Sequence, residues 1–285
     1  MSGITGLPEV TSQIQKFWSP MFMDELRQNN MLVNIVDKSY QADAPVMGDR
    51  VRISQINAPT GEIRTVGTDA DVYDTEALSL SYVDIDINKR ISAALEITEL
   101  SELQSQLGGQ QSSIRESLMH AVSTKLNTYL YSLLVPSTSA PDHALTSTDF
   151  AASEVSIARK TAAAAKWPTN EPWFLLVDPS YYSDILDDTT LSSSEYGATD
   201  APMVGGQVAL KRFGFNVLED NSLSTDIGYA LYKDALHLIM QKMPTFKVSD
   251  LHSQGKFGYV VSVDMVLGAK LGIDGDEKCI KWTAS

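Results

Sequence analysis

The carboxylates near residue 84 come closest in this sequence to the spacing of a metal-binding motif. Asp84, Asp86 and Asn88 alternate as the first three ligands of a calcium loop do. Such a loop also needs a glycine at its sixth position and a carboxylate at its twelfth, which here are Lys89 and Leu95. Because the motif is incomplete, we expect Asp84 and Asp86 to form the polar face of a strand.

The other groups that could do chemistry do not form a recognised motif either. Gly255-Lys256 is followed by Phe257 where a phosphate-binding loop needs a hydroxyl, and the acidic residues 274–277 fit a solvated turn. We expect each of the four histidines to be a surface or packed side chain rather than a base or ligand: His120, His143, His237 and His252. We therefore predict no enzyme activity, no cofactor and no metal site.

Composition narrows the class of partner that the chain can bind. The 285 residues include 22 Lys/Arg and 36 Asp/Glu, a formal net charge of -14, which opposes nonspecific attraction to nucleic acid or anionic lipid. Residues 136–236 hold 14 acidic and 6 basic side chains, a net charge of -8. Cys279 is the single cysteine, so no intrachain disulfide forms and a reducing cytosol fits. We expect no secretory signal, and no apolar run approaches the length of a membrane span.

The first third of the chain predicts an arm with one helix, followed by a β-rich segment. Methionines and leucines recur at helical spacing near residues 20–37. Strands near residues 50–56 and 62–66 flank a turn at 58–61, which makes a hairpin. Residues 78–88 alternate, but the apolar phase changes between Tyr82 and Val83, which predicts a bulge or a strand that leaves one sheet for another.

The rest of the chain predicts a mixture of helices and strands, and hence an α+β fold. Helices are expected over residues 92–107, 110–134, 149–166 and from Asp178 to Leu186. The second of these has the clearest apolar stripe, at Ile114, Leu118, Val122, Leu126 and Leu130. A buried strand is expected at residues 173–177, a polar loop at 187–207, and further short elements at 213–218 and 230–240. Long antiparallel strands within residues 244–272 are expected to pack on the helix over 110–134.

This order of parts resembles the major capsid proteins of tailed double-stranded DNA phages, which have the Hong Kong 97-type fold. The resemblance rests on an opening motif, a strand entry and the later segment 177–186. The matching residues of the first two are Trp18, Ser19, Pro20, Phe22, Leu26, Arg27 and Asn29, then Gly48, Asp49, Val51 and Ile53. The order of elements, which covers nearly the whole chain, supports the resemblance more than any single motif does.

The resemblance implies a layout of four parts. An N-terminal arm would span residues 1–45 and an extended β-hairpin loop residues 46–90. A peripheral domain with a long spine helix would comprise residues 91–147 and 236–285. An α/β axial domain would span residues 148–235.

The resemblance also implies a function and a set of partners. The chain would self-assemble, as pentamers and hexamers, into the icosahedral head shell that encloses phage double-stranded DNA without sequence-specific binding. It would be made in the host cytoplasm and end in the virion, with separate scaffolding, portal and cement proteins as further partners and no membrane. Two alternatives stay open: an encapsulin-like bacterial nanocompartment shell, and a cytosolic enzyme of unknown class.

The arginines of the predicted hairpin are candidate contact residues between copies of the chain. Arg50 and Arg52 share one face of a strand because side chains alternate, and Arg64 lies on the second predicted strand. They form either a solvated face or ion pairs with acidic patches on a neighbouring copy. No lysine lies between Lys38 and Lys89, so the covalent crosslinking through a loop lysine that some relatives use is not expected.

Overall fold

The computed structural model describes residues 30–40, 49–61, 63, 75–99, 111–135, 143–144, 150–188, 211–252 and 255–283. The helices among these residues are α2 (Leu32–Ile35), α4 (Gln111–Leu133), α5 (Ala152–Ala164), α6 (Pro179–Asp187) and the short 3-10 helix η5 (Lys233–Ala235). The strands are β1 (Arg50–Ile56), β2 (Leu80–Asp86), β3 (Lys89–Thr98), β4 (His143–Ala144), β5 (Trp173–Val177), β6 (Lys211–Arg212), β7 (Phe215–Glu219), β8 (Ile227–Tyr232), β9 (Leu236–Asp250), β10 (Gly258–Leu271) and β11 (Cys279–Thr283).

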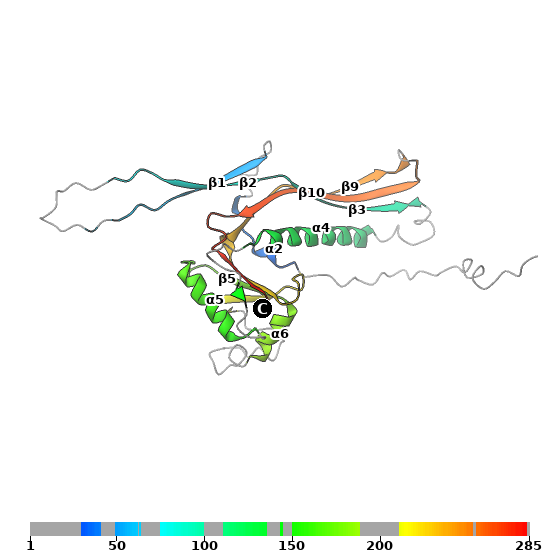
Figure 1. Ribbon diagram of the computed structural model, residues 1–285. Helices are drawn as coiled ribbons and strands as arrows, with labels where there is room; N and C mark the ends of the chain where they lie inside the picture. The colour runs from blue at the N-terminus through cyan, green and yellow to red at the C-terminus, as the bar shows by residue number, and fades with distance from the viewer. Residues whose placement is uncertain are drawn as a thin grey trace, which may run out of the picture.

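A long helix crosses a three-stranded antiparallel sheet in the upper part of the molecule. The strand order is β3-β10-β9, and α4 runs along one face of this sheet (Figure 1). Leu118, Val122, Leu126 and Leu130 are buried against alternate residues of β10, including Val263. The structure therefore confirms the predicted long helix, its apolar stripe and the long antiparallel strands that pack on it.

The predicted helix over residues 92–107 is wrong for its first part, which is the strand β3. Residues 92–98 include Ala, Leu and Glu, which favour helices, so local preference misled the prediction. In the structure β3 pairs with β10 along all ten of its residues, and Ile97 is buried beneath the sheet. Tertiary pairing overrides the local preference here. Residues 100–107 lie outside the described part of the chain.

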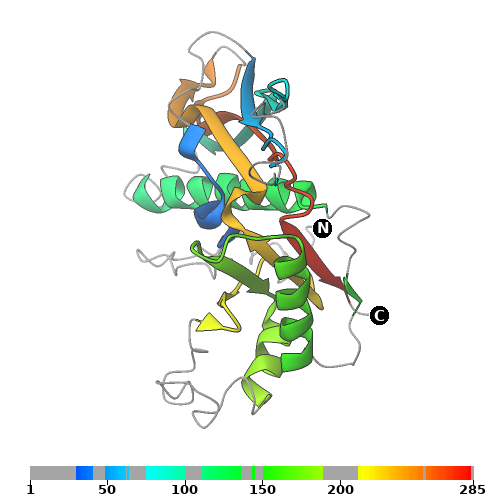
Figure 2. The same cartoon turned by 90° about the vertical axis from the view of Figure 1, so that its left-hand side faces the viewer.

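A six-stranded mixed sheet with two helices forms the lower lobe. Its order is β4-β11-β8-β5-β7-β6, and in Figure 2 α4 lies across the molecule above this lobe. Residues of β5 alternate between two cores: Trp173 and Leu175 pack with α5 and α6, whereas Leu176 packs with the core around α4. Because both faces are covered, the strand is a continuous apolar run, as predicted for residues 173–177.

Local capping fixes the ends of the two lobe helices. The Asp178 carboxylate accepts hydrogen bonds from the backbone N–H groups of Ser180 and Tyr181, which confirms the predicted start of α6. Helix α5 ends where Lys166 adopts a left-handed conformation with φ 60°. The N–H of Lys166 bonds to the Ala163 carbonyl and that of Trp167 to the Ala162 carbonyl, as in a Schellman motif.

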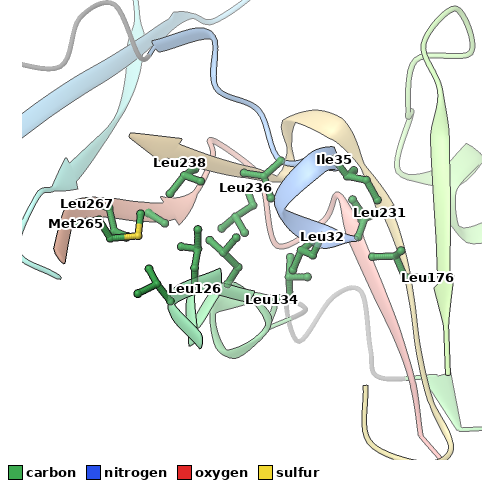
Figure 3. Packing of buried hydrophobic residues seen from close by; sticks show 14 of the residues in the cluster. Leu32, Ile35, Leu126, Leu134, Leu176, Leu231, Leu236, Leu238, Met265 and Leu267 are labelled. Carbon is green, nitrogen blue, oxygen red and sulfur yellow. The ribbon is translucent and has the colours of Figure 1, made fainter. Parts of the chain in front are cut away.

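The end of the arm inserts between the upper and lower parts and joins them. In Figure 3, Leu32 and Ile35 of α2 lie with Leu176 and Leu231 from the lobe and with leucines of α4 and β9. The buried Asp220 carboxylate accepts hydrogen bonds from the Met31 N–H, at 3.3 Å, and from the Tyr131 hydroxyl, at 2.6 Å. This contact buries the Tyr131 phenol, and burial together with the Asp220 charge raises its pKa well above the usual range.

Candidate assembly surface on the extended hairpin

Strands β1 and β2 form a hairpin that projects from the body of the molecule. The strand that pairs with β1 is not the one that the sequence predicted. Strand β1 pairs in antiparallel register with β2, Arg50 opposite Asp86 and Ile56 opposite Leu80. The prediction that residues 62–66 form the second strand is wrong about the partner of β1, because the true partner lies more than 20 residues along the chain. Residues 62 and 64–66, including Arg64, lie outside the described residues, and the described Ile63 lies in no strand.

The inner face of the hairpin root packs onto the body. Val51, Ile53, Ile85 and Ile87 form a small buried cluster with Ile239 of β9. The hairpin is also held by polar contacts at this root. The Ile87 N–H donates to the Asp49 carbonyl at 2.7 Å, and the Lys270 ammonium donates to the Asp84 carbonyl at 3.1 Å.

One glycine lets the hairpin root approach the sheet. A Cβ at Gly268 of β10 would lie 2.5 Å from the Asp86 carbonyl oxygen and 3.1 Å from the Ile87 Cα. Real side-chain carbons do not approach backbone so closely, so only glycine allows this crossing. The close approach of the hairpin root to β10 therefore requires glycine at this position.

The outer face of the root carries paired charges. Arg50 and Arg52 share this face, as the strand alternation predicted. The Arg50 guanidinium donates to Asp86 at 2.6 Å, and Arg52 donates twice to Asp84, at 2.6 and 2.9 Å. The hydrogen bonds from Arg52 hold the pKa of Asp84 below its usual range.

Two of the predicted contact residues, Arg50 and Arg52, therefore form ion pairs within their own chain. Asp84 and Asp86 form the polar strand face that the sequence predicted, opposite an Arg-x-Arg pattern of the same spacing on β1. That complementary spacing was a signal in the sequence that could have identified the true strand pairing. Exposed pairs of this kind contribute little stability each. A contact of Arg50, Arg52 or Arg64 with a neighbouring copy stays a prediction.

Beyond the ion pairs, the outer face becomes apolar and stays exposed. The side chains of Ile56, Leu78, Leu80 and Tyr82 are 64%, 72%, 54% and 61% exposed. The predicted bulge or change of sheet at Tyr82-Val83 is wrong, because β2 pairs with β1 without interruption and both phases of the alternation belong to one strand. The change of apolar phase has another cause. Near the root the apolar side chains lie on the buried inner face, whereas farther along the hairpin they lie on the exposed outer face. An isolated two-stranded ribbon is marginally stable, so such a patch favours burial against another surface.

Two of the histidines that might have carried chemistry make contacts with other described residues of the fold. No group of three or more His, Cys, Asp or Glu side chains there could hold a metal ion. The His237 ring is buried, pairs with the Asp37 carboxylate at 2.9 Å and meets the Tyr40 ring edge-on. His252 lies on the surface beside the Phe257 ring. No helix in the described residues is long and apolar enough to cross a membrane.

Comparison with solved structures shows the class of fold. A structure from Mycobacterium phage Che8 matches with a TM-score of 0.74 and 20% identity over 98% of both chains. The capsid asymmetric unit of cyanophage Pam1 matches with a TM-score of 0.72 and 13% identity over 99% of both chains. The head structure of Helicobacter pylori bacteriophage KHP40 matches with a TM-score of 0.70 and 13% identity over 100% of this chain and 98% of that one.

The similarity to these proteins is in structure, with little identity in sequence. It extends over nearly the full length of each. No protein-family model and no curated protein matches the chain. The chain therefore has the mixed α and β fold of phage capsid proteins.

Proposed function

We propose that this chain is the major capsid protein of a tailed phage and self-assembles into the icosahedral shell that encloses double-stranded DNA. The observation that supports this most strongly is the likeness to phage capsid and head structures over nearly the whole length of both chains. The role is structural, with pentamers and hexamers as its assembly units and the virion as its location. Separate scaffolding, portal and cement proteins would be further partners.

The four-part layout of the Hong Kong 97-type fold fits the elements. The arm would be residues 1–45 and the extended loop 46–90, with β1 and β2 as its stem. The peripheral domain would be 91–147 and 236–285, with α4 as the spine helix. The axial domain would be 148–235, and its sheet gains β11 from the end of the chain through pairing with β8.

The hairpin and the opposite end of the molecule have complementary properties, which supports head-to-tail association. Residues 56–80 contain five acidic and one basic side chain, whereas residues 242–258 contain three lysines and one aspartate. The latter stretch, where β9 ends and β10 begins, also exposes Phe246, Val248 and Phe257. Figure 1 shows β1 and β2 at the opposite end of the molecule from the end of β9. A hairpin that covers such a surface on the next copy makes a heterologous contact, which builds rings and closed shells.

Contact with DNA in this proposal is nonspecific and weak. The net charge of -14 gives the inside of a shell little attraction for phosphate, so packaged DNA would be enclosed without being tightly held. The contact of the hairpin with a neighbouring copy would include Arg50, Arg52 and Arg64. Arg50 and Arg52 keep guanidinium N–H donors beyond those used on Asp84 and Asp86, because a guanidinium has five.

Assembly of the purified chain tests this proposal. The chain would be expressed alone and with a separate scaffolding protein, then measured by light scattering and negative-stain electron microscopy. We expect uniform shells or capsomer rings. A monomer under both conditions would contradict the proposal.

The matched variants are Leu80→Ser, on the exposed outer patch of the hairpin, and Ser54→Ala, on the same face nearer the root. Loss of assembly in the first and its retention in the second would place the contact on the outer patch.

A further inference from the structure

Two asparagines lie where the arm, α4 and the lower lobe meet, and each has a buried oxygen that lacks a donor. The Oδ1 atoms of Asn30 and Asn127 are buried, and neither accepts a hydrogen bond from a described residue. Asn127 as a whole is only 1% exposed. Buried acceptors of this kind are rare in native proteins, because each forfeits a hydrogen bond that water would make. Both oxygens therefore need a donor.

The amide nitrogen of each asparagine is already bound, which fixes the position of its oxygen. The Asn30 Nδ2 donates to the Ser123 hydroxyl at 3.0 Å, and the Asn127 Nδ2 donates to the Ser222 hydroxyl at 2.7 Å. Ser123 and Asn127 are four residues apart in α4, so they lie one turn apart on the same face of the helix. The arm asparagine therefore meets α4 one turn before the helix asparagine.

The carboxylate of Asp220 connects the same three segments. It accepts hydrogen bonds from the Met31 N–H, at 3.3 Å, and from the Tyr131 hydroxyl, at 2.6 Å. It also accepts from the N–H and the hydroxyl of Ser222, at 2.9 and 2.6 Å. Met31 directly follows the arm asparagine, and Ser222 is the residue that the helix asparagine contacts, so the polar contacts form a closed ring. Asp220 is fully buried, which places the ring inside the protein.

We propose that this ring holds a buried water molecule, which donates its two O–H groups to the Oδ1 atoms of Asn30 and Asn127. Water fits because two acceptors lack donors and one water molecule carries two. The O–H of Ser123, whose oxygen accepts from Asn30, gives the water a third bond, the usual number for a buried water. The water thus joins the arm to α4.

Other ligands suit the ring less well. An apolar group would leave both amide oxygens without a donor, and an anion would add negative charge beside the buried Asp220. A metal ion finds no free carboxylate oxygen, because the four hydrogen bonds to Asp220 occupy its lone pairs. The inference concerns a single copy of the chain and does not rest on the proposed function.

Leucine at either asparagine removes an oxygen from the site and nearly keeps the size of the side chain. Long-lived waters would be counted in the unassembled full chain by magnetic relaxation dispersion of the solvent. We expect Asn127→Leu and Asn30→Leu each to lose about one long-lived water. The double variant should also lose about one, because both oxygens bind the same molecule.

The matched control is Asn57→Leu. Asn57 is exposed, and its Nδ2 and Oδ1 both have partners, Ser79 and Ser81. Water at such a site exchanges quickly with solvent, so this variant should keep the wild-type number of long-lived waters.

A second measurement uses the stability of alanine variants in chemical denaturation. A shared water couples Asn30→Ala to Asn127→Ala, so the change in the unfolding equilibrium constant of the double variant should differ from the product of the single changes by about twofold or more. Asn57→Ala combined with Asn127→Ala should give the product of the single changes.

Three results would overturn the inference. The first is an unchanged number of long-lived waters in Asn127→Leu or Asn30→Leu. The second is a loss of two waters in the double leucine variant, because each oxygen would then bind its own water. The third is coupling of the alanine variants without loss of a water, which would assign a direct contact instead. If the leucine variants do not fold, a high-resolution structure of the wild type decides: a water peak within hydrogen-bond distance of both oxygens supports the inference, and a protein donor there overturns it.

Discussion

Replacing Gly268 with alanine should displace the extended hairpin from the body. The new Cβ would lie 2.5 Å from the Asp86 carbonyl oxygen, whereas ordinary contacts begin at 3.4 Å. The hairpin root must therefore move by about 0.9 Å, because the atoms it meets are backbone and cannot rotate away. The shift would strain the root, including the 2.7 Å hydrogen bond from Ile87 to Asp49 and the packing of Ile85.

Two opposing effects determine how much Gly268→Ala changes the free energy of unfolding. Overpacking of this kind costs about 1–3 kcal/mol, and removing a glycine from a strand returns about 0.5–1 kcal/mol of backbone entropy. The net destabilisation of Gly268→Ala is thus about 0–2.5 kcal/mol, or a fall in Tm of up to about 4 °C for a chain of 285 residues. Because the root sets the direction of the hairpin, we expect shell assembly to fail or to give irregular particles.

The assay combines calorimetry, hydrogen exchange at the Ile87 N–H and electron microscopy. Gly61→Ala is the matched control, since a Cβ at Gly61 would meet nothing within 4 Å and its backbone is ordinary. That variant should unfold and assemble like the wild type. Wild-type Tm, exchange and shells in Gly268→Ala would refute the claim that backbone contact at this glycine sets the hairpin direction.

Three further predictions concern the core and the buried polar contacts. Leu130→Ala removes a fully buried side chain of α4 and should cost about 2–5 kcal/mol, measured by chemical denaturation. Tyr131→Phe removes one donor from the buried Asp220 carboxylate and should cost about 1–3 kcal/mol by the same measurement. The Lys242 ammonium holds the pKa of Asp264 below its ordinary 3.8, so this carboxylate stabilises the fold above that pH. That contribution disappears as the pH falls through the lowered pKa, and Asp264→Asn should flatten this part of the stability profile.

Each of these three variants has a control variant at a comparable residue. Met119→Ala truncates an exposed side chain of α4 and should change stability by less than about 0.5 kcal/mol. Tyr129→Phe removes a half-buried hydroxyl from the same helix without touching Asp220. Asp274→Asn alters an exposed turn and should leave the acid limb of the profile unchanged. Controls that lose as much stability as the tested variants would contradict the assigned contacts.

Local patterns in the sequence were enough to predict the elements that bury a regular face. The stripe through Leu118, Val122 and Leu126 and the run at residues 173–177 each specify one structure, because burial requires that spacing. The Asp178 cap likewise follows from chemistry within three residues. These features predict an α+β fold, and their order along the chain supports the capsid resemblance.

Long-range contacts could not be predicted in the same way. The pairing of β1 with β2 spans a connection of more than 20 residues, and β3 is a strand because β10 lies beside it. The pairing of β3 leaves no local signal, and the signal for β1 and β2 is the matching spacing of arginines and aspartates in segments that lie far apart in the sequence. The close approach at Gly268 is likewise set by tertiary geometry. The candidate surface therefore emerged only once the strands were placed.

Cryo-electron microscopy of the particles formed by the chain tests the central claim most directly. The account predicts a closed icosahedral shell of pentamers and hexamers. Within it, a neighbouring copy should cover Ile56, Leu80 and Tyr82 on the outer face of the hairpin. A chain that forms no shell, or a shell that leaves this apolar face open to solvent, would contradict the account.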